Sequence, residues 1–192
     1  MALGAHASTE SEEFRMQSRA RLLGHSLHQI LIAFPLGLLG MSVAFDVLRL
    51  VTGDRMWSMV SFYMIGAGVL CGLAAAGAGL IDYLAIPPLT RARYIGRMHG
   101  LLSVLLVVLF ACSWLIRRSD SSAVVISALA LSLLGGGLLA IAGWLGGELV
   151  TRMGVGVDDG AHLDAQSSLS GNPIVTRAPG PRPGPSPLHS RP

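Results

Sequence analysis

The sequence predicts an all-α integral membrane protein, a four-helix bundle that crosses the bilayer. Hydrophobic residues make up 52% of the 192 residues and charged residues only 13%, whereas a typical soluble domain carries about 25% charged residues. The apolar residues are concentrated in four long runs, which is typical of membrane spans. The length fits a single domain.

We expect the spans at about 28–50, 56–84, 92–116 and 123–150, within a transmembrane domain at 25–157. The uncharged part of the first span, 30–45, gives about 24 Å of helix at ~1.5 Å per residue, slightly short of a hydrocarbon core of about 30 Å. At its end, Asp46 and Arg49 are three residues apart, a spacing that predicts an ion pair. Pro87 and Pro88 should end the second span, and Thr90 is the predicted N-cap of the third.

The two flanks of this domain are polar. Residues 1–24 contain a Ser/Thr/Glu cluster at 8–13, which predicts a short interfacial helix that continues through Arg21. Acidic residues in this segment argue against a secretory signal, so the first span is expected to stay uncleaved. The Pro/Gly/Ser-rich tail at 158–192 has little apolar content and is predicted to be disordered.

The arginines near the spans predict the orientation, because cytoplasmic loops carry an excess of basic residues. If the N-terminus is inside, seven arginines lie on the inner face and four on the outer face. The inner set is Arg15, Arg19, Arg21, Arg91, Arg93, Arg97 and Arg152, and the outer set is Arg49, Arg55, Arg117 and Arg118. We therefore predict that both termini are cytoplasmic.

On this topology, five polar residues reach the same, cytoplasmic, face. His25 and His28 begin the first span, Asp82 ends the second, His99 begins the third and Glu148 ends the fourth. Two arginines complete this predicted polar cluster, Arg97 and Arg152. Glu148 and Arg152 are four residues apart, which also suits a simple helix-surface pair.

The layout also predicts a repeat of two helical hairpins related by an axis along the membrane normal. Each half begins near a histidine and ends at a carboxylate, so His28 would correspond to His99, and Asp82 to Glu148. Small residues line two of the helices, including the GxxxG pair Gly68 and Gly72, and such faces permit close helix packing or a homodimer.

The sequence leaves three functions open. Imidazoles that face each other in a bundle can ligate a single haem b or another metal, with His28 and His99 as ligands and His25 in reserve. A His–carboxylate set can instead handle protons or serve a small transporter through Asp82 and Glu148. In the third reading these groups only close the helix ends of a structural or assembly module. We do not expect an enzyme, because no nucleophile constellation or phosphate loop is present, and the arginine pattern does not indicate a nucleic-acid partner.

Four ordered motifs resemble a known family. They are GHSLHQILIAFPLG at 24–37, GLIDYLAIP at 79–87, RMH at 97–99, and GWLGGELV at 143–150 with GVGV at 154–157. The chain resembles the bacterial membrane family called domain of unknown function 2231, with Ser26 and Gln29 where that family often has proline. The resemblance implies a four-span protein of the bacterial plasma (inner) membrane. Some members are fused to Rieske-type iron–sulfur domains, which implies a redox setting and a separate iron–sulfur partner here.

Overall fold

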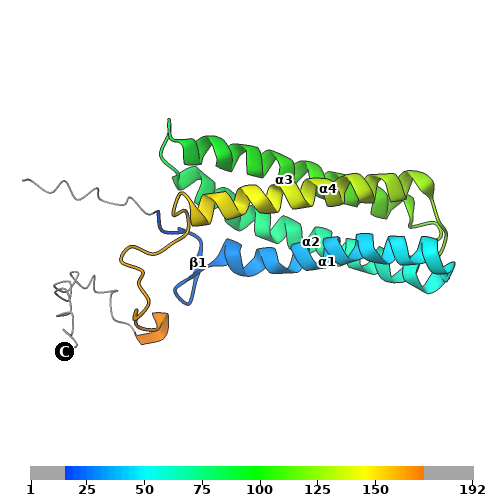
Figure 1. The fold of residues 1–192 in the computed structure, drawn as a ribbon, viewed down its shortest axis with the longest axis horizontal. Coiled ribbons are helices and arrows are strands. Elements are labelled where there is room, and N and C mark those ends of the chain that lie inside the picture. The colour runs from blue at the N-terminus through cyan, green and yellow to red at the C-terminus, as the bar shows by residue number, and fades with distance from the viewer. Residues whose placement is uncertain (1–15, 171–192) are drawn as a thin grey trace, which may run out of the picture.

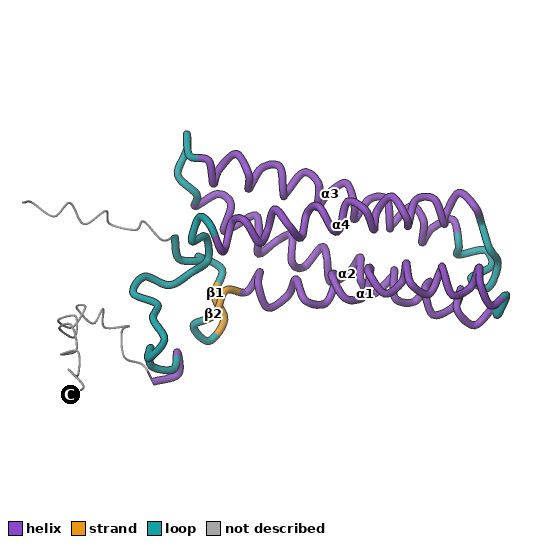
Figure 2. The backbone as a smooth tube through the Cα atoms, in the orientation of Figure 1, coloured by secondary structure: helices purple, strands orange, loops and turns teal. Residues whose placement is uncertain are grey.

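The computed structural model describes residues 16–170. Its four helices are α1 (Leu27–Thr52), α2 (Arg55–Ala85), α3 (Arg91–Ile116) and α4 (Ile126–Thr151). They lie side by side in one elongated bundle (Figures 1 and 2). Each is long and apolar enough to cross a membrane. The predicted all-α membrane four-helix bundle is confirmed.

The helix ends follow the local sequence. The Asp54 carboxylate accepts a hydrogen bond from the Met56 N–H at the start of α2, and the Thr90 hydroxyl accepts one from the Arg93 N–H, as predicted for the N-cap of α3. The start of α4 is three residues later than the predicted 123, because Ser122 donates two hydrogen bonds to Asp120 and holds a turn there. These hydrogen bonds also lower the pKa of Asp120 below its usual value.

The bundle is built from two hairpins. α1 packs along α2 and α3 packs along α4, while the α2–α3 and α1–α4 contacts join the hairpins. α1 and α3 therefore lie on a diagonal. The apolar core between the helices is formed by Leu39, Ile65, Leu106, Phe110 and Ala142.

The two hairpins close over glycines in the same way. A Cβ atom on Gly68 would lie 2.6 Å from Leu39 Cδ2, and one on Gly135 would lie 2.8 Å from Phe110 Cε2. Phe110 follows Leu39 by 71 residues (110 minus 39), and Gly135 follows Gly68 by 67 (135 minus 68). The predicted repeat therefore recurs in the packing. Of the two uses that the sequence left open for the Gly68 face, Gly68 serves helix packing within the chain.

The terminal segments cover one end of the bundle. β1 (Arg21–Leu22) and β2 (His25–Ser26) form a short antiparallel hairpin, and Met16 pairs with Val155. Residues 16–20 form no helix and 21–22 form β1, whereas the sequence predicted an interfacial helix through Arg21; the rest of that predicted helix lies outside the described residues. Of the predicted disordered tail, residues 158–170 form a loop ending in the 3₁₀ turn Ser168–Ser170, and residues 171–192 lie outside the described part of the chain.

Candidate functional site

The predicted polar residues all lie at the end of the bundle that the terminal segments cover, which we call the histidine end (Figure 1). His25 lies in β2, His28 in the first turn of α1 and His99 near the start of α3. Asp82 and Glu148 lie near the ends of α2 and α4. The structure does not gather them into one cluster: His28 and His99 lie together, while Asp82, His25 and Glu148 each have a different partner.

His28 and His99 meet across the bundle on the diagonal helices α1 and α3. Their ring centroids are 6.3 Å apart and the planes are at 89°. His28 Nδ1 lies 2.8 Å from the Ala75 carbonyl oxygen on α2, and His99 Nδ1 lies 2.9 Å from that of Ala142 on α4. A carbonyl oxygen only accepts hydrogen bonds, so Nδ1 carries a proton in both rings, and in the neutral form of such a ring the lone pair is on Nε2. Backbone carbonyls thus orient both rings.

A glycine makes room for each histidine ring. A Cβ atom on Gly79 would lie 2.8 Å from His28 Nδ1, and one on Gly146 would lie 3.3 Å from His99 Cε1. Each glycine comes four residues after the alanine whose carbonyl binds the ring, one turn further along the helix. The two histidines therefore occupy matching sites, which agrees with their predicted equivalence.

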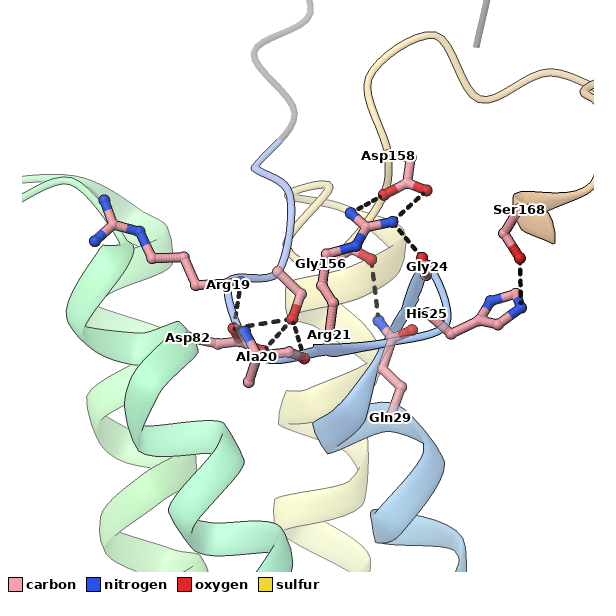
Figure 3. A network of polar contacts seen from close by, with 11 residues as sticks. Arg19, Ala20, Arg21, Gly24, His25, Gln29, Asp82, Gly156, Asp158 and Ser168 are labelled. Carbon is pink, nitrogen blue, oxygen red and sulfur yellow. Dashed lines mark hydrogen bonds and ion pairs between the residues drawn. The ribbon is translucent and has the colours of Figure 1, made fainter. Parts of the chain in front are cut away.

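Asp82 binds the N-terminal segment and not a histidine (Figure 3). Its buried carboxylate accepts hydrogen bonds from the Ser18 hydroxyl at 2.8 and 2.9 Å, from the Arg19 N–H at 2.8 Å and from the Ala20 N–H at 3.1 Å. These bonds take up two backbone donors that a helix would have used internally, which explains why this segment is not helical. Asp82 is an anchor for the segment that precedes α1.

His25 lies away from the other two histidines. Its Nε2 is 3.2 Å from the Ser168 hydroxyl (Figure 3). Beside it, Arg21 donates two hydrogen bonds to Asp158, at 2.6 and 2.9 Å, and these bonds raise the pKa of Arg21. The N-terminal hairpin is thereby fixed to the segment after α4, and His25 belongs to that contact.

The remaining residues of the predicted cluster also separate. Glu148 lies 3.7 Å from Arg91 of α3 and does not pair with Arg152, which is exposed. The Arg97 guanidinium lies over the Tyr94 ring, 5.7 Å from its centroid. The predicted equivalence of Asp82 and Glu148 is wrong by one residue. Matching positions of α2 and α4 are 67 residues apart, as Gly68 and Gly135 are, so the residue of α4 that corresponds to Asp82 is the buried Leu149.

The opposite end of the bundle contains a buried ion pair that the sequence reading missed. Asp46 was expected to pair with Arg49, but it binds Arg117 through two hydrogen bonds of 2.6 and 2.7 Å. The two side chains are only 3% and 5% exposed. Arg49 instead donates to the carbonyl of Gly53 at the end of α1.

Three serines complete this group, which we call the Arg117 cluster: Asp46, Ser61, Ser113, Arg117 and Ser132. The Arg117 guanidinium donates to the hydroxyls of Ser113, Ser61 and Ser132 at 3.2, 3.3 and 3.0 Å. With the two bonds to Asp46, all five of its N–H donors have an acceptor. The cluster joins α1, α2 and α4 to the C-terminal end of α3.

Comparison with known families identifies the chain. The model of the family described as "Predicted membrane protein (DUF2231)" matches residues 24–159. The chain belongs to this family. Neither a curated protein nor a solved structure matches it.

The DUF2231 match covers the four helices, His28 and His99, and the Arg117 cluster, but not Ser18, Arg19 and Ala20. The repeat could have revealed the Arg117 cluster in the sequence. Asp46 follows His28 by 18 residues (46 minus 28), and Arg117 follows His99 by the same number (117 minus 99). A serine precedes each charge by one helical turn, Ser42 and Ser113.

Proposed function

We propose that this chain is a redox-associated accessory protein of the membrane in which His28 and His99 hold one metal centre, a haem b iron or another transition-metal ion. The pairing of the two rings across the bundle supports this proposal most. Each ring donates from Nδ1 to a backbone carbonyl, which is the arrangement that fixes the orientation of metal-ligating histidines and leaves Nε2 to bind the metal.

The donor set favours a centre that brings its own ligands. The described residues contain no group of three His, Cys, Asp or Glu side chains suited to a metal ion. A structural zinc site takes four protein ligands, whereas a haem iron needs only its axial ligands from the protein because the porphyrin supplies the others. Two histidines on facing helices fit the second kind of centre.

The test is an absorption spectrum with metal analysis of the full chain, purified in detergent from cells supplied with iron and a haem precursor. We expect a Soret band, or about one metal ion per chain. His28→Gln and His99→Gln should each remove it while leaving the fold intact, because glutamine can still donate to the carbonyl. The matched control His25→Gln should keep the spectrum, since His25 binds Ser168. Colourless and metal-free wild-type protein would overturn the proposal.

The second candidate is an assembly module without chemistry of its own. The observation in its favour is that the buried charged groups Arg117, Asp46 and Asp82 are bonded within the chain, above all Arg117 with its five donors. For this function, His28→Gln and His99→Gln would change only stability or complex formation. The spectra of the same variants therefore separate the two candidates. A transporter using Asp82 and Glu148 is less favoured, because these residues bind Ser18 and Arg91.

For the cellular setting, we propose a bacterial plasma membrane with the histidine end and both termini in the cytoplasm, on the basis of the arginine distribution. A separate Rieske-type iron–sulfur protein is the proposed redox partner. A homodimer is also proposed, now through Gly143 and Gly147 of α4, where an added Cβ would meet nothing within 4 Å. Cross-linking in the membrane and reporter fusions at each terminus test the dimer and the orientation.

A further inference from the structure

The start of α3 carries three arginines within seven residues, and their surroundings differ. Arg93 is half-buried and donates to the carbonyls of Tyr83 and Ile86 at 2.6 and 3.0 Å, with its guanidinium 4.2 Å from the Tyr83 ring centroid. It closes the end of α2 and is not available to a ligand. Arg91 and Arg97 remain.

These two arginines carry positive charge that the described residues compensate poorly. Arg91 is 70% exposed at its side chain, and its carboxylate partner among the described residues is Glu148, at 3.7 Å. Arg97 is exposed and has no carboxylate partner in residues 16–170, and its guanidinium lies over Tyr94. Asp82, near the end of α2, is buried and bonded to the N-terminal segment, so it does not neutralise Arg97. An anion brought to this surface meets mostly positive charge.

The same face of α3 continues as an apolar stripe. Leu101, Val104 and Val108 follow Arg97 at spacings of three and four residues, which places them on one side of the helix. They are 60%, 59% and 49% exposed. The stripe from 101 to 108 is about 10 Å long at ~1.5 Å per residue. One helix face thus presents the Arg97 guanidinium and the Tyr94 phenol beside a row of aliphatic side chains, and Arg91 adds a positive charge about 120° around the helix from Arg97, at ~3.6 residues per turn.

We infer that this face of α3 binds an anionic phospholipid, with the phosphate at Arg97 and an acyl chain along Leu101, Val104 and Val108, while the positive charge of Arg91 beside this face adds to the attraction. A guanidinium matches the geometry of phosphate oxygens, and a tyrosine such as Tyr94 suits the headgroup level of a bilayer. The apolar stripe distinguishes a lipid from a free phosphate ion, which would use only the arginines. The site is separate from the His28–His99 pair and does not depend on what that pair binds.

The experiment is native mass spectrometry of the detergent-purified full chain with equimolar phosphatidylglycerol and phosphatidylcholine. We expect the chain to retain phosphatidylglycerol selectively. Arg97→Gln should weaken retention about fivefold and Arg91→Gln with Arg97→Gln about 25-fold, the fold-changes that correspond to about 1 kcal/mol for each arginine near a lipid surface. Arg97→Lys should keep most of the binding, because it preserves the charge.

The chain offers a matched control at the other end of the bundle. Arg118 is also exposed and lies over an aromatic ring, 5.5 Å from the Trp114 centroid, so Arg118→Gln removes an equivalent charge away from the site. It should leave retention unchanged. Equal retention of the two lipids, undiminished retention by the Arg91/Arg97 double variant, or displacement of the lipid by inorganic phosphate at millimolar concentration would each overturn the inference; the last result would indicate a free-anion site.

Discussion

Arg117 and Asp46 show how a membrane protein keeps a charge pair away from water. Removing two charges from water costs several kcal/mol for each ion, and the pair is tolerated only when the geometry is good and the remaining donors are satisfied. Here the two carboxylate oxygens take one N–H from each terminal nitrogen, and three serine hydroxyls accept the others. Arg117 therefore depends on four partners, Asp46 and the three serines, and a single substitution at any of them would leave one or more of its donors without an acceptor.

Asp46→Ala should destabilise the protein by about 3–5 kcal/mol, because it leaves the Arg117 charge buried without a counter-charge. Unfolding of detergent-solubilised protein by heat or denaturant measures the change. The control is the double variant Asp46→Leu with Arg117→Met, which removes both charges and keeps the volume, and it should lie within about 1 kcal/mol of the wild type or above it. If the double variant is as unstable as Asp46→Ala, lost packing explains the effect and the unpaired charge does not.

At the scale of the helices, glycines decide where the elements touch. The glycines that meet a neighbouring side chain mark the contacts of each hairpin, such as Gly68 with Leu39, Gly135 with Phe110 and Gly79 with His28. In a membrane the apolar faces gain little from leaving the lipid, so close packing of this kind is the main force between helices. The histidines also belong to this scale, since each one binds the neighbouring helix of its own hairpin.

Gly79→Ala should release His28 from the Ala75 carbonyl, because the new Cβ would lie 2.8 Å from Nδ1. We expect a loss of about 1–3 kcal/mol, as for other overpacked positions. Gly77→Ala, on the same helix with nothing within 4 Å of the added Cβ, is the control and should gain up to about 1 kcal/mol from helix propensity. Unfolding and the NMR signal of the His28 Nδ1–H measure both variants. An intact Nδ1–H signal in Gly79→Ala would contradict this account of the glycine.

At the scale of the whole molecule, two diagonal pairs mark the two ends of the bundle. The His28–His99 pair and the Asp46–Arg117 pair are 18 residues apart along both α1 and the α3 segment, which is about 27 Å at ~1.5 Å per residue. A hydrocarbon core is about 30 Å thick, so the separation of the two pairs is close to the thickness of the core. Between them lies the apolar core of Leu39, Ile65, Leu106, Phe110 and Ala142.

Since Asp46 and Arg117 occupy equivalent positions of the two hairpins, 71 residues apart, their charges should be exchangeable in part. Arg117→Asp alone places two carboxylates together and should prevent stable folding. Adding Asp46→Arg should restore a folded bundle that is less stable than the wild type. The restoration is partial because the exchanged arginine would meet the residues that correspond to the three serines in the other hairpin. Ser42 corresponds to Ser113, at the 71-residue offset of α1 and α3, and can accept a hydrogen bond. Ile65 and Ala128 correspond to Ser132 and Ser61, at the 67-residue offset of α2 and α4, and cannot. Expression and thermal unfolding of the single and double variants test this, and equal failure of both would argue against the equivalence.

The sequence by itself determined the four spans, their ends within a few residues and the gathering of His25, His28, Asp82, His99 and Glu148 at one end. Hydropathy and helix length are local properties, and antiparallel spans bring alternate helix ends together whatever their packing. Only the tertiary structure decided which polar groups bind each other. Asp46 has Arg49 one helical turn away, yet it faces the bundle interior, where Arg117 and three serines supply its partners. Asp82 likewise binds residues 18–20 and not a histidine. Such pairings depend on the rotation and depth of each helix against its neighbours, which packing across the whole bundle sets and which no spacing within one span records.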